Sequence, residues 1–343
     1  MKVADKVIAY ASGLESGKVL SVCKHFPGHG DTDVDSHKAL PVLPFTRERL
    51  DSVELYPFKE AIRAGVSGMM VGHLQVPVIE PIGDLPSSLS RNVVYGLLTE
   101  ELAFKGLIFT DALAMKGVAG NKSVCLQALQ AGNDMVLAPR RLKEEMDAVL
   151  EAVEKGELPE EEINAKCRKV LTYKYILGLE RKPFVKLSGL GTRINTPQTR
   201  DLISRLNLAA ITVLNNKNDV LPLHPDLKEA AILNVGKPEE IEPFDRKMKK
   251  YTSFARFQLR KDLPEAEQQK LRDSLAAYRR VIVTVTEQRL APYQSFFAKF
   301  APESPVIYVF YTPAKSMLQI QRAVSAAEAV VLALSLIHIS EPT

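Results

Sequence analysis

The chain has 343 residues, 46% hydrophobic and 25% charged, which is the ordinary composition of a globular protein with room for two domains. Its net charge of +4 is small for this length, so the composition gives no sign of nucleic-acid binding. No apolar run approaches the ~18 residues that a helix needs to span a bilayer, and no membrane span is predicted.

The first 180 residues alternate predicted helices and strands, beginning with a helix at Met1–Ser12 that Gly13 ends. Strands are predicted at Val19–Cys23, Gly68–Val71, Leu107–Phe109 and Asp134–Leu137. Further helices are predicted at Arg47–Ala64, Arg91–Phe104 with Ser90 as its N-cap, Val118–Ala131, Leu142–Lys155 and Pro159–Leu177. This alternation is typical of a parallel sheet, in either a (β/α) barrel or a doubly wound fold.

A polar segment at 181–199, which contains two prolines and two glycines, is predicted to be a linker. A second α/β segment follows at 200–333. Its helices are predicted at Arg200–Ala210 and Pro264–Tyr278, and its strands at Ile211–Leu214, Ala231–Val235, Arg280–Val285, Val306–Tyr311 and Ala329–Ala333. The pattern therefore predicts two α/β domains joined by a short connection.

The residues best suited to chemistry gather just after the first predicted strand. The run from Lys24 to His37 reads KHFPGHGDTDVDSH and holds three of the six histidines in the chain. Gly28 and Gly30 allow the backbone to turn sharply there. Parallel α/β folds place their functional groups in such loops, at the carboxyl ends of the strands.

This run resembles the signature of family 3 glycoside hydrolases, and its Asp35-Ser36-His37 ending resembles the β-N-acetylglucosaminidase branch. The resemblance continues through GLIFTDALAM at 106–115 and AGNDMVL at 131–137, and it covers residues 1–333. It implies the C-terminal half of a TIM-type (β/α)8 barrel at 1–180, comprising strands five to eight. A partial αβα sandwich domain at 200–333 would follow the linker.

The resemblance also implies catalytic roles. Asp111 would be the nucleophile of a retaining glycosidase, although an aspartate there can also cap the next helix. His37 would be the general acid and then the general base, oriented by Asp35. A neighbouring carboxylate favours the imidazolium and raises the pKa of a histidine, which suits a group that must donate a proton near neutral pH.

Three further residues are implied to contact the sugar. Lys24 and His25 resemble hydroxyl-binding residues of the family, and His73, after the second strand, is expected to face the same subsite. The alternative for Lys24 is a surface lysine at a strand end. His29 is expected to support the loop and not to bind substrate.

A metal site does not fit the sequence. Asp31, Asp33 and Asp35 alternate like a calcium loop, but Ser36 and Val42 stand where that loop needs glycine and glutamate. A zinc site built from His25, His29 and His37 lacks the usual setting of two histidines on a helix. We therefore expect neither a metal nor a cofactor.

The first helix and the last ten residues of the chain lead to two further predictions. By the resemblance, a helix like the uncapped Met1–Ser12 precedes the fifth barrel strand, so strands one to four are expected to be missing. The last ten residues, LSLIHISEPT at 334–343, resemble a translated sequencing adapter and are set apart from the fold. An ordinary strand and turn is the alternative for this tail. The compartment, bacterial cytoplasm or periplasm, stays open.

Together these features predict a retaining β-N-acetylglucosaminidase acting on N-acetylglucosaminides, such as muropeptide-like glycosides. One alternative is a β-N-acetylglucosaminide phosphorylase, in which phosphate replaces water, and a metal-dependent hydrolase is another. A third is an inactive fragment, because half a barrel exposes two strand edges and lacks part of its active site. On that reasoning the chain expressed as written is expected to be insoluble or expanded, and inactive.

Overall fold

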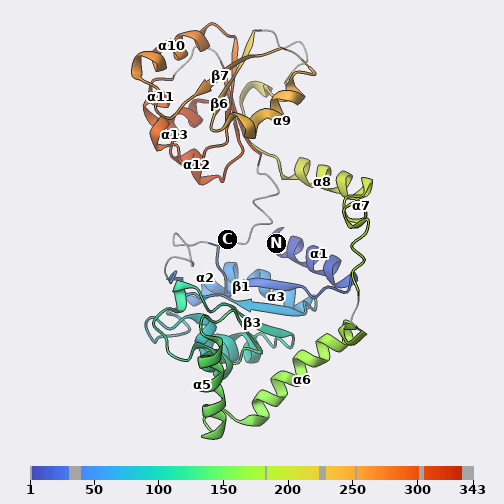
Figure 1. Ribbon diagram of the computed structural model, residues 1–343. Coiled ribbons are helices and arrows are strands. Elements are labelled where there is room, and N and C mark those ends of the chain that lie inside the picture. Colours follow the sequence, from blue (N-terminus) through green and yellow to red (C-terminus); the bar gives the residue numbers. More distant parts are fainter. Residues whose placement is uncertain are drawn as a thin grey trace. The chain divides into compact units, whose positions relative to one another are not determined.

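The computed structural model describes residues 2–30, 40–181, 184–223, 229–251, 253–300 and 305–333. The chain divides into two compact units, Met1–Val185 and Lys186–Thr343 (Figure 1). Each unit is a mixed α/β structure built on a sheet of mainly parallel strands. In the described residues, no helix combines the length and apolar character needed to cross a membrane.

The first unit contains a four-stranded parallel sheet whose strands lie side by side in chain order. These are β1 (Val22–Phe26), β2 (Gly68–Val71), β3 (Leu107–Ala112) and β4 (Met135–Leu137). Its α-helices are α1 (Lys2–Ser16), α2 (Arg47–Arg49), α3 (Tyr56–Arg63), α4 (Val124–Ala131), α5 (Leu142–Glu154) and α6 (Glu160–Ile176). Parallel strands in chain order with helical crossovers are the arrangement of half a (β/α) barrel, and the predicted fold class is confirmed.

Shorter helical segments complete this unit. The π-helical segments are η1 (Leu50–Glu54) and η3 (Asn92–Glu101), and the 3₁₀ turns are η2 (Ser87–Leu89), η4 (Lys116–Val118) and η5 (Leu179–Arg181). The predicted N-cap is confirmed, because the Ser90 hydroxyl accepts a hydrogen bond from the Val93 amide at 3.2 Å. The helix predicted at Val118–Ala131 begins only at Val124, since Gly120 adopts a φ of 101° that ends any earlier turn.

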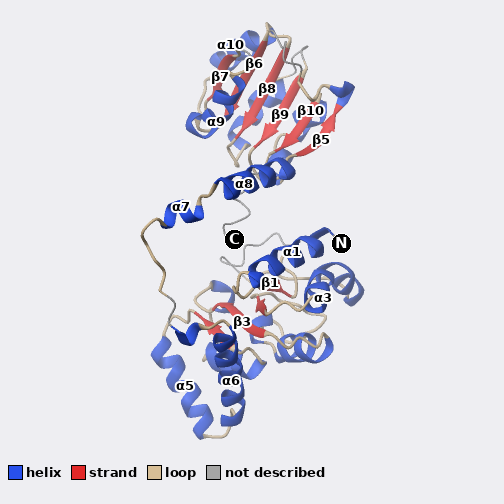
Figure 2. Ribbon diagram, turned by 90° about the vertical axis from the view of Figure 1, so that its right-hand side faces the viewer, coloured by secondary structure: helices blue, strands red, loops and turns tan. Residues whose placement is uncertain are grey.

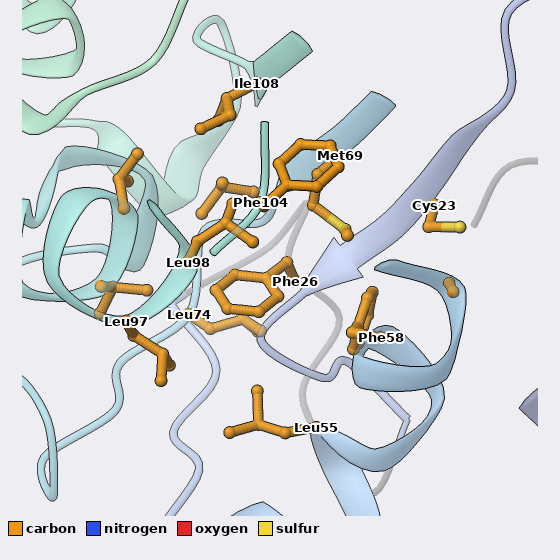
Figure 3. Packing of buried hydrophobic residues seen from close by; sticks show 14 of the residues in the cluster. Cys23, Phe26, Leu55, Phe58, Met69, Leu74, Leu97, Leu98, Phe104 and Ile108 are labelled. Atoms are coloured by element: carbon orange, nitrogen blue, oxygen red, sulfur yellow. The ribbon is translucent and has the colours of Figure 1, made fainter. Parts of the chain in front are cut away.

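The larger of two hydrophobic clusters in this unit packs β1, β2 and β3 against helices, and Figure 3 shows Phe26 at its centre. Phe26, the last residue of β1, is fully buried and packs edge-to-face on Phe58 of α3, with 5.4 Å between ring centroids. Leu74 and Met69 also belong to this cluster. Because Phe26 directly follows Lys24 and His25, its burial fixes where these two polar residues emerge.

Two predicted boundaries in this region are wrong. The first strand was expected at Val19–Cys23, but β1 runs from Val22 to Phe26, and Val19 is exposed. The strand therefore includes the consecutive polar residues Lys24 and His25 between the buried Cys23 and Phe26, where its pairing with β2 shifts register. The first helix was expected to end at Gly13, yet α1 continues to Ser16, because a single glycine costs a helix only ~1 kcal/mol.

The second unit is a six-stranded sheet in the order β5-β10-β9-β8-β6-β7, in which only β5 runs antiparallel to its neighbour (Figure 2). The strands are β5 (Thr212–Asn216), β6 (Ala230–Val235), β7 (Ala255–Leu259), β8 (Arg280–Val285), β9 (Val306–Phe310) and β10 (Ala329–Leu332). Its helical elements are α7 (Leu190–Ile194), α8 (Pro197–Ala210), η6 (Lys217–Asp219), α9 (Pro238–Met248), α10 (Glu265–Ala276), η7 (Ala291–Tyr293), α11 (Gln294–Lys299), α12 (Lys315–Leu318) and α13 (Gln321–Ala326).

Helices cover both faces of this second sheet. One hydrophobic cluster joins β6, β8 and β9 to α10, α11 and α13, and another joins the opposite face to α9 (Figure 1). Such a layered sheet agrees with the predicted αβα sandwich. The expected linker at 181–199 is wrong in part, because α7 lies inside it and α8 starts at Pro197, capped by the Thr196 side chain. Threonine before proline is an N-terminal helix signal that the sequence did contain.

Candidate active site

The candidate site lies where the strands of the first sheet end. Phe26 pairs with Val71 and Val71 with Thr110, so the carboxyl ends of β1, β2 and β3 are level with one another. His25 belongs to β1, Gly72 and His73 follow β2, and Asp111 lies within β3. Asp111 was expected just beyond its strand, but β3 continues through it to Ala112.

The carboxylate of Asp111 is oriented by the backbone at the end of β3. The pairing between β3 and β4 shifts between Phe109 and Ala112, and such an irregularity re-aims the side chains next to it. Carboxylate atom Oδ1 of Asp111 accepts a hydrogen bond from the Ala112 amide at 2.8 Å. The other oxygen, Oδ2, lies 3.5 Å from Nε2 of His25, and the Asp111 side chain keeps 15% of its surface exposed.

His25 reaches Asp111 across the end of β2. A Cβ atom at Gly72 would lie 3.0 Å from the His25 Cβ, so the missing side chain at Gly72 leaves room for the histidine. The pKa of His25 is lowered to about 4, chiefly by burial, which outweighs the attraction of Asp111; Lys24, His29 and His73 contribute to the lowering. His25 is therefore a neutral imidazole at pH 7, and its contact with Asp111 is not an ion pair.

His73 is buried and engages the protein with both ring nitrogens. Atom Nδ1 lies 2.7 Å from the Ser88 hydroxyl, and Nε2 lies 3.1 Å from the Ala112 carbonyl oxygen. Burial lowers the pKa of His73, although the Ala112 carbonyl and Asp111 oppose this shift. These bonds leave neither nitrogen for a sugar hydroxyl, so the predicted sugar contact of His73 stays a prediction that this geometry does not favour.

The loop after β2 is held by buried serines and a buried carboxylate. The Ser87 hydroxyl donates to the Gly72 carbonyl at 2.7 Å and accepts from the Leu74 amide at 3.2 Å. Glu80 accepts from the Ser90 hydroxyl at 2.6 Å and from the Asn92 amide group at 3.2 Å. These bonds fix the backbone on both sides of His73.

A second support lies under the loop that begins at Pro27. Gly28 has a φ of 144°, and a Cβ atom there would lie 2.6 Å from the Glu54 Cβ. Glu54, at the end of η1, is buried and forms an ion pair of 2.9 Å with Arg49, which also stacks on Phe45. No sequence pattern marks Glu54 or Ser88 as part of the site, because the fold alone brings their partners close.

Of the other residues singled out in the sequence, the structure describes Lys24 and His29. Lys24 lies on β1 beside His25 and is exposed, and the His29 ring stands edge-on to His25 with 5.9 Å between centroids. His37 and Asp35, the predicted acid/base pair, lie outside the described residues, as do residues 334–343. In the described ranges, no group of three or more acidic, histidine or cysteine side chains is arranged to hold a metal ion.

Comparison with known proteins places this site in a family. A β-hexosaminidase A from Pseudoalteromonas piscicida is 32% identical over 238 residues, which cover 63% of this chain and 39% of that protein. A β-hexosaminidase from Nitrosospira multiformis is 40% identical over 138 residues, covering 39% of each. The chain thus spans about two fifths of the length of these curated relatives.

Solved structures agree with this assignment. The glycoside hydrolase family 3 β-N-acetylglucosaminidase of Paenibacillus sp. str. FPU-7 superposes with a TM-score of 0.76 at 28% identity. The match covers 95% of this chain and 64% of that one. The model of the glycosyl hydrolase family 3 N-terminal domain matches residues 2–173, which contain the whole candidate site. The chain therefore belongs to glycosyl hydrolase family 3.

Proposed function

We propose that the chain carries the catalytic centre of a retaining β-N-acetylhexosaminidase that releases terminal N-acetylglucosamine from peptidoglycan-type glycosides. Retaining hydrolysis needs one group to attack the anomeric carbon and another to protonate the leaving oxygen and then activate water. Asp111 is the attacking group, and His37, oriented by Asp35, is the acid and then the base. The relatives called β-hexosaminidases and the solved β-N-acetylglucosaminidase support this substrate class.

The contacts of the Asp111 carboxylate are the observation that carries the proposal. Oδ1 is held by the Ala112 amide, while Oδ2 faces a histidine that is neutral at pH 7. A cation in place of His25 would form an ion pair and compete with the sugar for the carboxylate. With a neutral neighbour, the negative charge is available to attack the anomeric carbon and to stabilise the positive charge that develops there.

The residues of β1 supply hydrogen-bond donors for the sugar. Lys24 is exposed, and the ring of His25 lies next to the proposed nucleophile. Both residues are held in place by the buried Phe26 that follows them. In this proposal they bind hydroxyl groups of the N-acetylglucosamine ring while Asp111 attacks it.

Turnover, stereochemistry and covalent trapping test the proposal together. Because half a barrel alone is expected to be inactive, these assays use the chain joined to the first four barrel strands. There we expect release of 4-nitrophenol from the β-N-acetylglucosaminide to be faster than from the β-glucoside, with the β-anomer as the first product seen by proton NMR. A fluorinated N-acetylglucosamine that accumulates the intermediate should label Asp111 in peptide mass spectrometry. A label on another carboxylate, an inverted product or no turnover contradicts the proposal. If inorganic phosphate yields N-acetylglucosamine 1-phosphate, the enzyme is a phosphorylase.

The role of His37 is tested with substrates that differ in their leaving group. His37→Ala should slow natural glycosides by ~10²–10⁴-fold, because their poor leaving groups need protonation. Activated aryl glycosides need little protonation and should lose much less in the glycosylation step. Equal losses on both kinds of substrate would restrict His37 to shaping its loop.

A further inference from the structure

We infer that His73 is a positioning residue for the nucleophile: its Nε2–H holds the end of β3 through the Ala112 carbonyl, and Ser88 supports its other ring nitrogen. This inference rests on the proposed role of Asp111. It differs from the sugar contact predicted for His73, because here the histidine acts through the backbone and does not touch substrate.

The hydrogen-bond partners determine which ring nitrogen carries the proton. The Ala112 carbonyl oxygen can only accept, so Nε2 of His73 must carry the hydrogen in the 3.1 Å contact. Burial keeps the ring neutral, which leaves Nδ1 with a lone pair that accepts the Ser88 hydroxyl hydrogen at 2.7 Å. The Ala112 carbonyl thereby selects the Nε2–H tautomer, because in the other tautomer two acceptors would face each other, and the Ser88 hydroxyl turns to donate to Nδ1.

The bond to Ala112 acts next to the nucleophile. The peptide between Ala112 and Leu113 is held at both ends, because its carbonyl accepts from His73 and its N–H donates to Leu137 of β4 at 2.8 Å. The N–H on the other side of Ala112 donates to Oδ1 of Asp111. Fixing Ala112 therefore fixes the donor that orients the Asp111 carboxylate, at the point where the β3–β4 register shifts.

His73 can act as a rigid link because its own support is anchored. The Ser88 carbonyl accepts from the Asn133 side chain at 2.9 Å, and Asn133 is fully buried. Ser87, the preceding residue, bonds to Gly72 and Leu74 on either side of His73. The chain of contacts runs from Asn133 through Ser88 and His73 to Ala112, and it ends at the nucleophile.

Two substitutions of His73 distinguish its contact with Ala112 from its contact with Ser88. In His73→Gln the side-chain amide can extend to the position of Nε2 and still donate to Ala112, whereas the shorter amide of His73→Asn reaches only Ser88. We expect His73→Asn to lower kcat on the aryl N-acetylglucosaminide by about 10–100-fold with KM nearly unchanged, because small displacements of a reacting group cost that much. His73→Gln should recover most of this loss. A sugar-binding His73 would instead raise KM in both variants.

Two NMR measurements test the contacts of His73 with Ser88 and Ala112 without an activity assay. In protein labelled with ¹⁵N-histidine, His73 should show the neutral Nε2–H tautomer, and Ser88→Ala, which leaves the bond to Ala112 in place, should keep it. The Ala112 amide resonance should shift in His73→Asn but not in His73→Gln, since that amide bonds to Asp111. An Nδ1–H tautomer in the unaltered protein, equal kcat losses in both His73 variants, or an unmoved Ala112 amide would overturn the inference. Absence of turnover in the unaltered protein would refute the proposed function alone.

Discussion

The two sheets of the molecule use their carboxyl edges differently. At the edge of the first sheet, Asp111 faces a neutral His25, and its charge is left without a cation in the described part of the chain. At the corresponding edge of the second sheet, the loops after β6 and β8 line a cavity of about 270 Å³. That cavity contains two cations and two anions, and one such pair, Lys237 and Glu240, lies 3.7 Å apart.

The strands of the two sheets also differ in how completely their residues are buried. Every residue of β6 and β9 is buried, because helices cover both faces of the second sheet. In β1 only Cys23 and Phe26 are buried, with Lys24 and His25 between them, and in β3 the burial ends at Thr110, one residue before Asp111. Polar strand ends cost stability but place reactive groups, whereas the second sheet is built for packing. The contrast assigns chemistry to the first unit and can be tested by substitutions in each.

The largest expected effect on activity comes from replacing the Asp111 carboxylate. Asp111→Asn should lower kcat about 10³-fold or more, since it removes the proposed nucleophile. The melting temperature should change little, because the asparagine oxygen can still accept from the Ala112 amide. Asp147→Asn on α5 is the matched control, an exposed carboxylate paired with Lys143, and it should retain full activity. Comparable losses in both variants would contradict the role of Asp111.

A core substitution should damage the second unit alone. Phe310 is fully buried and stacks on Tyr308 at 5.8 Å between centroids, so Phe310→Ala should cost ~3–5 kcal/mol in unfolding free energy. Hydrogen exchange followed by mass spectrometry should show faster exchange in β6, β8 and β9 and unchanged exchange in β1–β3. Leu318→Ala on α12, at an exposed site, should change stability by less than ~0.5 kcal/mol. Equal loss of protection in both units would show that they do not unfold separately.

How far the sequence predicts this fold depends on the kind of strand. Buried strands with unbroken apolar runs were placed correctly, as at Gly68–Val71 and Arg280–Val285. The edge strand β7 was missed, because Arg256 and Gln258 interrupt its apolar pattern on a partly exposed surface. The π-helical turns of η1 and η3 have no periodicity of their own and were read as ordinary helix.

Some residues of the site are marked by a local sequence pattern, and others are brought together only by the fold. Asp111 could be predicted as the nucleophile because it lies near the end of an apolar strand within a run that resembles the family, and this role stays a prediction. The bond between His73 and Ser88 joins residues 15 positions apart, and no local pattern encodes it. The roles of His37 and Asp35 stay predictions, because these residues lie outside the described part of the chain.

The low pKa of His25 makes the first unit sensitive to acid. The pKa is about 4 in the folded chain and about 6.5 in an unfolded one, so between these values the unfolded state binds more protons. Stability should therefore fall as the pH drops from 6.5 towards 4, by up to ~3 kcal/mol. Urea unfolding of the unaltered chain and of His25→Gln across this range measures the difference, and the variant should show the shallower pH dependence. Identical slopes would mean that His25 does not contribute.

The smallest expected effect compares two glycines that follow corresponding strands. Gly28 after β1 and Gly236 after β6 both have positive φ, of 144° and 133°, and a Cβ atom on either would collide with a neighbour. Each substitution by alanine should cost ~1–3 kcal/mol in stability. Only Gly28→Ala should also lower kcat/KM, because its Cβ would displace Glu54 beneath the loop that follows His25.

A third glycine supplies the control for this comparison. Gly30 has no described atom within 4 Å of the position of a Cβ, so Gly30→Ala should leave stability and kcat/KM nearly unchanged. Thermal unfolding and steady-state kinetics on the three variants separate the two effects. If Gly236→Ala lowered kcat/KM as much as Gly28→Ala, the second sheet would take part in catalysis. The division between a reactive edge in the first unit and a packed one in the second would then be wrong.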